Sequence, residues 1–138
     1  MKAFLDTNIL LDVLVVRTDP KYSENAEIIL GLGENGTLDL YMSALSIPTI
    51  AYVLKNMTAD KKKAVIKDLT SIVKVLPSLP EHVTNMLESP MKDIEDALQA
   101  ESAKEGQCDI IVTRDTSDFR HVGLPVISSD EMIKRILG

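Results

Sequence analysis

Two aspartates in this chain each follow an apolar run, a placement that suits metal-ion chemistry. Asp6 comes directly after the apolar residues 3–5, and Asp115 follows the run 110–113, with Asp118 three positions further on. If both runs are parallel strands, their carboxyl ends open onto the crevice where α/β folds bind ligands. Carboxylates aimed at one place suggest a metal site.

A second acidic pair, Asp93 and Asp96, has helical spacing. Positions three apart share one face of a helix, so both carboxylates can enter one metal site. The alternative role for Asp93 is an N-cap, and Asp96 and the neighbouring Glu95 would suit the positive end of the helix dipole. Because small and apolar residues follow Asp96, its face is expected to turn inward, whereas both roles stay open for Asp93.

Capping and turn formation also compete for the aspartates at the strand ends. Thr7 and Asn8 are both competent N-caps for the helix expected after Asp6, so Asp6 is not needed in that role. For Asp115 and Asp118 the alternative is a polar turn after the strand, and this alternative suits Asp118 better.

Strand and helix patterns alternate along the chain and must position these residues. Apolar runs predict strands over residues 2–5, 38–42, 72–76, 110–113 and 126–128. Helical spacing and caps predict helices over residues 9–16, 23–35 with Ser23 as N-cap, 46–57, from 60 onward, after Pro80, 93–105 and 130–137. This rhythm implies a parallel sheet covered by helices on both faces.

Length and composition fit one domain over residues 1–138. The chain is 45% hydrophobic, which is enough for a single core, and we assign Val53 and Leu137 to that core. The one cysteine, Cys108, fits a buried thiol in a reducing compartment. Since the first residues form neither a signal-peptide core nor a membrane span, we expect a cytoplasmic protein.

Charge and aromatic content exclude some nucleic-acid binders. The net charge is −6, and aromatic residues make up 4% of the chain with no Trp. These values disfavour a protein that binds nucleic acid by general attraction or by base stacking. They weigh less against a metal-dependent enzyme, because bound cations reverse the sign of an acidic site.

The acidic residues fall in three motifs: Phe4-Leu5-Asp6-Thr7-Asn8, Asp96-Ala97-Leu98-Gln99-Ala100, and Ile111-Val112-Thr113-Arg114-Asp115-Thr116-Ser117-Asp118-Phe119. Together these motifs resemble those of PIN domains, the nuclease fold of VapC-type toxins in toxin–antitoxin pairs. The resemblance covers nearly the whole chain of 138 residues. It implies a three-layer α/β/α fold with a central five-stranded parallel sheet of order 3-2-1-4-5.

The resemblance also implies an activity, namely hydrolysis of RNA phosphodiester bonds with Mg²⁺ or Mn²⁺ and without a covalent protein intermediate. The metal ligands it implies are Asp6, Asp96 and Asp115, with Asp118 as a fourth carboxylate and Asp93 as a further candidate. The supporting residues are Thr7, Asn8, Thr49 and Thr113. An antitoxin protein and a second copy of the chain are the partners expected of such a family.

One position departs from the family pattern. PIN domains usually carry a Glu early on the helix after the second strand, and Thr49 aligns with it here. Asp93, Thr49 acting through a water molecule, or no residue at all would take its place. Because Mg²⁺ keeps several waters, losing one ligand should weaken the site without abolishing it.

Few other side chains suggest chemistry. Lys61, Lys62 and Lys63 form the best basic patch, which is either a solvated face or a guide for RNA, and Arg114 is a further candidate RNA contact. His82 and His121 lie far apart in sequence without ligand spacing. We expect them at the surface or at helix ends rather than as catalytic bases.

Two other classes of function remain open. The first is a PIN scaffold that has lost activity through Thr49 and binds a nucleic acid or a protein partner. The second is a phosphoacceptor domain of receiver type, which would need an acidic pair at the first strand and a Lys at the end of a late strand. Here the first strand supplies Asp6 alone and residues 126–128 end without a Lys, so the receiver ranks lower.

Overall fold

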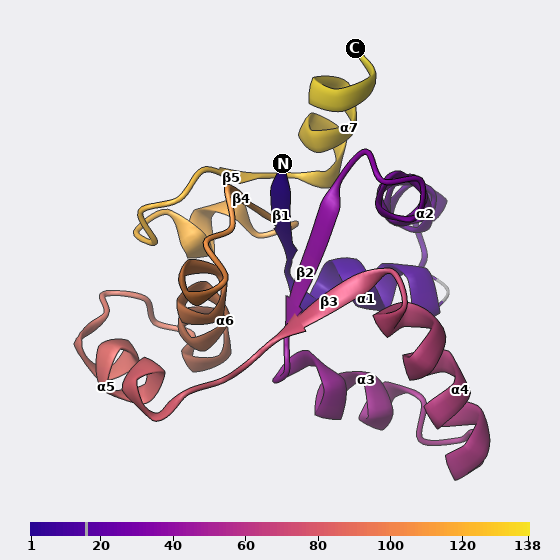
Figure 1. Ribbon diagram of the computed structural model, residues 1–138, viewed down its shortest axis with the longest axis horizontal. Coiled ribbons are helices and arrows are strands. Elements are labelled where there is room, and N and C mark those ends of the chain that lie inside the picture. The colour runs from indigo at the N-terminus through magenta and orange to yellow at the C-terminus, as the bar shows by residue number, and fades with distance from the viewer. Residues whose placement is uncertain (16) are drawn as a thin grey trace.

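A five-stranded parallel sheet forms the centre of the protein, in a computed structural model that describes residues 1–15 and 17–138. The strands are β1 (Lys2–Leu5), β2 (Asp39–Ser43), β3 (Val73–Leu76), β4 (Ile110–Val112) and β5 (Val126–Ile127). Their order in the sheet is β3-β2-β1-β4-β5, and every pairing is parallel (Figure 1). The predicted fold class and strand order are confirmed.

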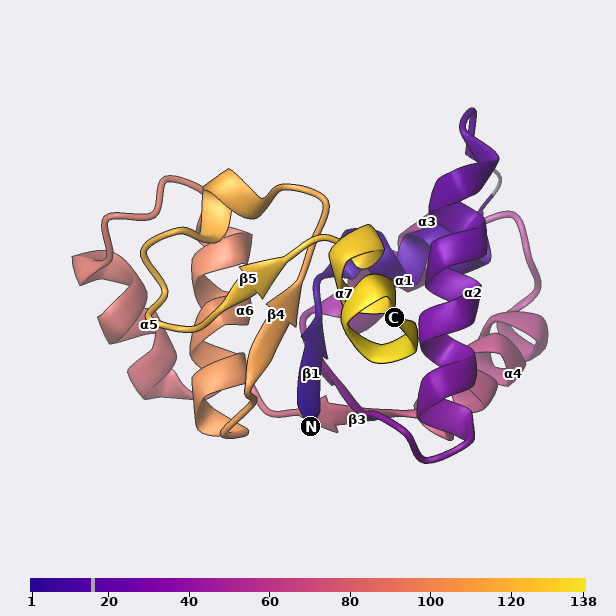
Figure 2. The ribbon, with the colours of Figure 1, turned by 90° about the horizontal axis from the view of Figure 1, so that it is seen from above.

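Helices cover both faces of this sheet and give a three-layer arrangement (Figure 2). The helices are α1 (Thr7–Leu14), α2 (Pro20–Glu34), α3 (Ser46–Val53), α4 (Ala59–Thr70), α5 (Pro80–Glu88), α6 (Ile94–Glu105), the 3-10 turn η1 (Thr116–Phe119) and α7 (Ser129–Leu137). Helices α5 and α6 lie on one side, and α1, α2 and α7 lie on the other. Within the described ranges, no helix is long and apolar enough to cross a membrane.

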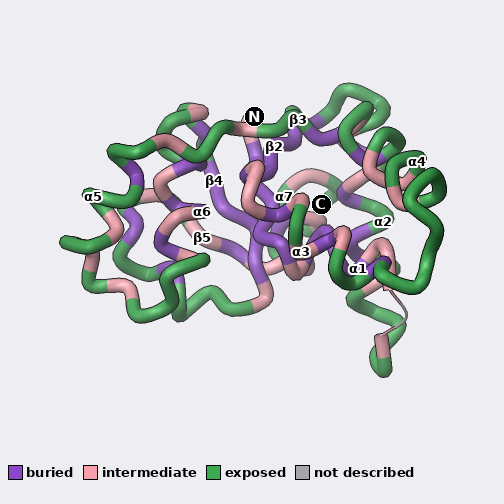
Figure 3. Tube along the Cα trace, turned by 90° about the horizontal axis from the view of Figure 1, so that it is seen from below, coloured by how far each residue is buried: buried purple, intermediate pink, exposed green. Residues whose placement is uncertain are grey.

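Strand β1 is buried on both faces, because its side chains alternate between two apolar cores. Ala3 and Leu5 pack into the core formed with α1, α2 and α7, whereas Phe4 packs into the core formed with α6 and η1. A strand buried on both faces reads as a continuous apolar run, which is the pattern that residues 3–5 show. Figure 3 shows the buried sheet at the centre and exposed segments of α4 and α5 at its flanks.

Several helix ends differ from the predicted ones. Helix α2 begins at Pro20, three residues before the predicted N-cap Ser23, because the Asp19 side chain accepts a hydrogen bond from the Lys21 N–H and proline suits the first helical turn. Helix α4 is capped by Thr58 and begins at Ala59. The predicted helix over 9–16 extends to residue 16, which lies outside the described residues.

Two residues assigned to the core are exposed. The exposed fraction is 62% for Leu137 and 36% for Val53, although their neighbours Met132 and Ile50 are fully buried. Leu137 is the last residue of α7, and Val53 is the last residue of α3. Apolar spacing on a helix identifies the inward face, but it does not show where the layer beneath that helix ends.

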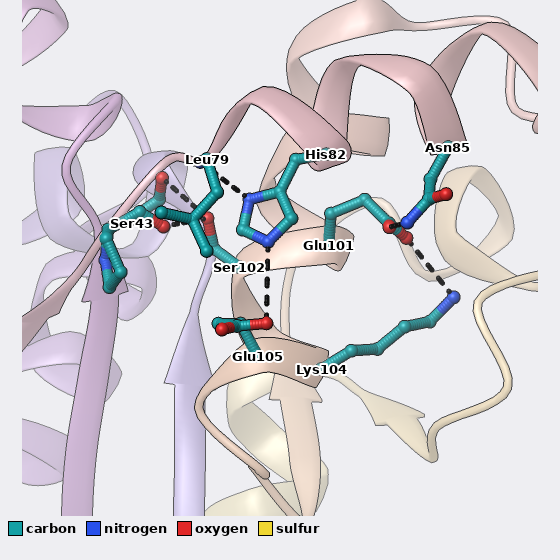
Figure 4. A network of polar contacts seen from close by, with 9 residues as sticks. Ser43, Leu79, His82, Asn85, Glu101, Ser102, Lys104 and Glu105 are labelled. Atoms are coloured by element: carbon teal, nitrogen blue, oxygen red, sulfur yellow. Dashed lines mark hydrogen bonds and ion pairs between the residues drawn. The ribbon is translucent and has the colours of Figure 1, made fainter.

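A polar network attaches α5 to α6, the helix that carries Asp96 (Figure 4). His82 has an exposed fraction of 2% and accepts a hydrogen bond from the Leu79 N–H at its Nδ1, 3.0 Å away. Its Nε2 lies 3.8 Å from Glu105 Oε2 on α6, and Asn85 on α5 donates to Glu101 on α6. The prediction of a surface position for His82 is wrong, because the side chain closes the α5–α6 interface, although its place in the first turn of α5 is a helix end.

We predict that Phe119→Ala destabilises the protein by about 3–4 kcal/mol, because this fully buried ring anchors η1 against α6 and its removal leaves a cavity. Leu137→Ala is the control and should change the free energy of unfolding by less than about 0.5 kcal/mol, since Leu137 is exposed. Urea unfolding measures both. Equal losses in the two variants would contradict this account of the second core.

Candidate functional site

A cavity of about 200 Å³ opens beyond the carboxyl ends of β1 and β4. It is lined by Asp6, Thr7, Asn8, Leu11, Thr49, Asp93, Glu95, Asp96, Gln99, Asp115 and Asp118. These residues come from α1, α3, α6 and the segment after β4, so the fold brings together parts of the chain that are far apart in sequence. All five aspartates of the predicted site line this one cavity, and none of its described lining residues carries a positive charge.

Asp6 is the fixed member of this group. Its exposed fraction is 2%, and its carboxylate is held from two directions. Gln99 Nε2 donates to Oδ1 at 3.0 Å, and Thr113 Oγ1 donates to Oδ2 at 2.8 Å. Asp6 occupies the N-cap position of α1, but its side chain accepts no capping bond from any residue that the structure describes. The carboxylate is therefore oriented by Gln99 on α6 and by Thr113 directly after β4.

Gln99 links Asp6 to the start of α1, a role that the sequence did not indicate. Its Oε1 accepts hydrogen bonds from the Thr7 N–H at 3.0 Å and from Thr7 Oγ1 at 3.1 Å. The Thr7 hydroxyl also lies 2.7 Å from Ser46 Oγ and 3.3 Å from Glu95 Oε1. Gln99 is three residues after Asp96, and this spacing on one helical face was the signal that could have identified it.

Thr113 connects the two strand-end aspartates. Its hydroxyl donates to Asp6 and accepts a hydrogen bond from the Asp115 N–H at 3.0 Å. The backbone N–H of Asp118 donates to the Asp115 carbonyl oxygen at 3.0 Å, which closes the turn η1. The buried Thr113 hydroxyl thus links the Asp115 backbone to the Asp6 side chain.

Asp93 does act as an N-cap, because its Oδ1 accepts a hydrogen bond from the Asp96 N–H at 2.9 Å. It also lines the cavity, so the capping role does not take this residue away from the site. Glu95, which the sequence placed only near the helix dipole, lines the cavity as well and contacts Thr7.

Electrostatics at this cavity favour a cation. Burial, together with the negative charges of Asp6, Asp93, Asp118 and Glu95, raises the pKa of Asp96 to about 7. Burial also raises the pKa of Asp6, although the hydrogen bonds from Thr113 and Gln99 oppose that effect. Carboxylates that resist ionisation because they repel each other gain most when a positive ion lies between them.

The predicted basic contacts lie outside this cavity. Lys61, Lys62 and Lys63 lie on the first turns of α4, and none of them lines the cavity. Arg114 instead turns toward Asp12 and Tyr22 on α1 and α2.

The donor atoms suit a hard divalent cation, since the lining side chains offer oxygen ligands and no thiolate or imidazole. Among residues 1–15 and 17–138, no three acidic, His or Cys side chains already form a set that could hold a metal ion. Asp115 and Asp118 are exposed and can adjust, whereas Asp6 is fixed. The residues therefore fit such an ion by charge and chemistry, with movement of the exposed carboxylates.

Comparison with known proteins places this chain in a family. The profile of the PIN domain matches residues 2–117. The chain belongs to the PIN domain family. It is 33% identical over 142 residues to Ribonuclease VapC1 of Aquifex aeolicus (strain VF5), and the match covers 97% of this chain and 94% of that relative.

Solved structures share the PIN fold. FitAcB from Neisseria gonorrhoeae superposes with a TM-score of 0.65 at 19% identity and covers 92% of this chain and 97% of that one. VapBC-1 from nontypeable Haemophilus influenzae gives a TM-score of 0.65 at 18% identity, with coverage of 94% and 99%. Receiver-type domains have the sheet order 2-1-3-4-5, whereas the PIN order here is 3-2-1-4-5, so the receiver alternative is excluded.

We predict that Asp96→Asn stabilises the metal-free protein at pH 8. The folded-state pKa of Asp96, about 7, lies above its ordinary value of 3.8, so ionisation opposes folding and stability falls as the pH rises from about 4 to 7. Because Asp96 is only half-buried and salt screens its neighbours, we expect a gain of about 1–2 kcal/mol.

Urea unfolding in EDTA at several pH values measures this gain, with the exposed Asp68→Asn as the control. The difference between Asp96→Asn and the unsubstituted protein should shrink as the pH is lowered from 7 toward 4, because the Asp96 carboxyl of the folded protein becomes protonated below its pKa of about 7. A gain that does not depend on pH would show that charge repulsion is not its cause.

Proposed function

We propose that this protein is a metal-dependent endoribonuclease and the toxin of a toxin–antitoxin pair. The observation that carries the proposal is the convergence of Asp6, Asp96, Asp115 and Asp118 on one cavity in which Asp6 is rigidly oriented. The relative named Ribonuclease VapC1 supports the nuclease activity. A structural neighbour described as a toxin–antitoxin complex from Klebsiella pneumoniae supports an antitoxin partner.

The four aspartates would hold Mg²⁺ or Mn²⁺. Such an ion, when bound, lowers the pKa of a coordinated water and offsets the charge of a phosphate. Gln99 and Thr113 act as positioning residues, because each donates to one oxygen of Asp6 and leaves the other lone pairs of that oxygen free. Water rather than a protein nucleophile is the attacking group in this proposal, because the carboxylates would hold the ion and the described lining side chains include no thiol or imidazole.

Glu95 is our candidate for the carboxylate that Thr49 does not supply. Both side chains line the same cavity, and Glu95 lies within 3.3 Å of the Thr7 hydroxyl. The acidic side chain would thus come from α6 instead of α3. This assignment replaces Asp93 in that role, since Asp93 already accepts the capping hydrogen bond of α6.

On the same basis we propose that the chain works as a single domain in the cytoplasm and pairs with a second copy of itself. The rival function is a PIN scaffold that binds partners without cleaving RNA, and Thr49 at the wall of the cavity is the observation that favours it. Metal binding without cleavage of a broad RNA pool would support the scaffold.

We predict that the purified protein cleaves labelled single-stranded RNA with Mn²⁺ or Mg²⁺ and that Asp6→Asn lowers the rate about 100-fold or more. The substitution keeps the shape of the side chain but removes the charge that a cation needs. A gel-based cleavage assay measures the rate, with EDTA as the metal-free reference and Asp68→Asn as the matched control. Cleavage that persists in EDTA would contradict the proposal of a metal-dependent ribonuclease.

We predict that Glu95→Gln weakens Mn²⁺ binding about 3- to 10-fold and that Thr49→Glu strengthens it, because the first removes a carboxylate from the cavity and the second adds one. Titration calorimetry measures both affinities without any substrate. Glu27→Gln, an exposed change on α2, should leave the affinity unchanged. Unaltered Mn²⁺ affinity in Glu95→Gln would contradict the assignment of Glu95 as the carboxylate that replaces the missing Glu.

A further inference from the structure

Two arginines share one buried carboxylate next to the candidate site. Asp12 has an exposed fraction of 1%, and its two oxygens face different guanidinium groups. Arg17 Nε lies 2.7 Å from Asp12 Oδ1, and Arg114 Nε lies 3.7 Å from Asp12 Oδ2. Asp12 lies on α1, within the helix that the sequence predicts over residues 9–16.

Both guanidinium groups are held while their outer nitrogen atoms stay accessible. The arginine side chains are 26% and 27% exposed, and the Arg114 guanidinium also lies 4.6 Å from the centre of the Tyr22 ring. Within the described part of the chain, no hydrogen bond uses the Nη atoms of either arginine. Both arginines therefore present N–H donors whose direction is already set.

These donors border a cavity of about 540 Å³, which is lined by Arg17, Thr18, Asp19, Pro20, Tyr22 and Arg114. The Asp19 carboxylate accepts the capping hydrogen bond of α2, from the Lys21 N–H. The negative charges of Asp12 and Asp19 balance the positive charges of Arg17 and Arg114, so the cavity has little net charge. Any anion would thus be recognised by directed N–H groups at short range rather than by a broad positive field.

The arginine cavity and the carboxylate cavity adjoin each other along two segments of the chain. Arg114 directly precedes Asp115, and Asp12 directly follows Leu11. Asp115 and Leu11 both line the carboxylate cavity. Arg114 lines one cavity and Asp115 lines the other, and their Cα atoms are about 3.8 Å apart, so neighbouring residues border the two sites. A polymer with regularly spaced anionic groups could therefore occupy both at once.

We propose that Arg17 and Arg114 bind a backbone phosphate of the RNA strand beside the bond that is cleaved at the carboxylate cavity. The planar fork of a guanidinium matches the oxygens of a phosphate, and neither arginine needs to be ordered when the strand arrives. This site deepens the proposed ribonuclease function and rests on it. It also makes Arg114, rather than Lys61, Lys62 and Lys63, the main basic contact for RNA.

Binding of a fluorescent, mixed-sequence single-stranded RNA, measured by anisotropy in Ca²⁺ at several KCl concentrations, tests the proposal. Arg114→Gln should raise the Kd about 5-fold near 0.1 M salt and reduce the slope of log K against log salt by about 0.7, the change expected for one lost phosphate contact on a single strand. Arg114→Lys should keep the slope, because it keeps the charge. Arg135→Gln removes an exposed arginine of α7 and should change neither value.

The fold should survive Arg114→Gln, because Arg17 still pairs with Asp12 at 2.7 Å. Thermal unfolding checks this, and Tyr22→Leu is a second variant that frees the Arg114 guanidinium without touching Asp12. The same Kd and slope in Arg114→Gln as in Arg135→Gln would overturn the proposal, as would a lack of RNA binding by the unsubstituted protein. Loss of binding in Arg114→Gln, together with no cleavage in any metal, would uphold the phosphate site and reject the nuclease function.

Discussion

The burial of the Asp6 carboxylate is the constraint on which the site depends. A buried carboxylate is costly unless its oxygens are hydrogen-bonded, and each oxygen of Asp6 has a donor on a different segment, Gln99 on α6 and Thr113 after β4. Because the two donors lie on different segments, α6 and the end of β4 must both pack beside β1 for the two hydrogen bonds to form. The orientation of the Asp6 side chain therefore depends on how β1, β4 and α6 pack together.

Concentrating negative charge around that carboxylate has a consequence for function. The cavity gathers six acidic side chains without a basic one among its described lining residues, and burial together with the negative charge of its acidic neighbours raises the pKa of Asp96. The only buried arginine–carboxylate cluster that the described residues form nearby, Asp12 with Arg17 and Arg114, lies outside the cavity. Among the described residues, the basic side chains thus lie outside the carboxylate cavity, as the proposed metal site requires.

Much of this arrangement could be predicted from the sequence, because it rests on patterns along the chain. Apolar runs ending in Asp6 and Asp115 identify the strands, and a resemblance to PIN domains supplied the strand order. Gln99, Ser46 and Asp12 were missed, since their roles depend on which helix faces meet in the folded protein. The burial of His82 was not predicted for the same reason, because it comes from the apposition of α5 and α6. More than one residue near a helix start can act as its N-cap, as with Asp19 and the predicted Ser23 at α2. The predicted helix ends therefore differ from the observed ones by a few residues.

The measurement that tests the central claim most directly is anomalous X-ray diffraction from crystals of the protein soaked in Mn²⁺. Our account predicts an anomalous peak inside the carboxylate cavity, within ligating distance of oxygens from Asp6 and Asp96 and with Asp115 or Asp118 turned toward it. Peaks found only at carboxylates on the outer surface, or no peak in a soak that saturates binding in solution, would contradict it.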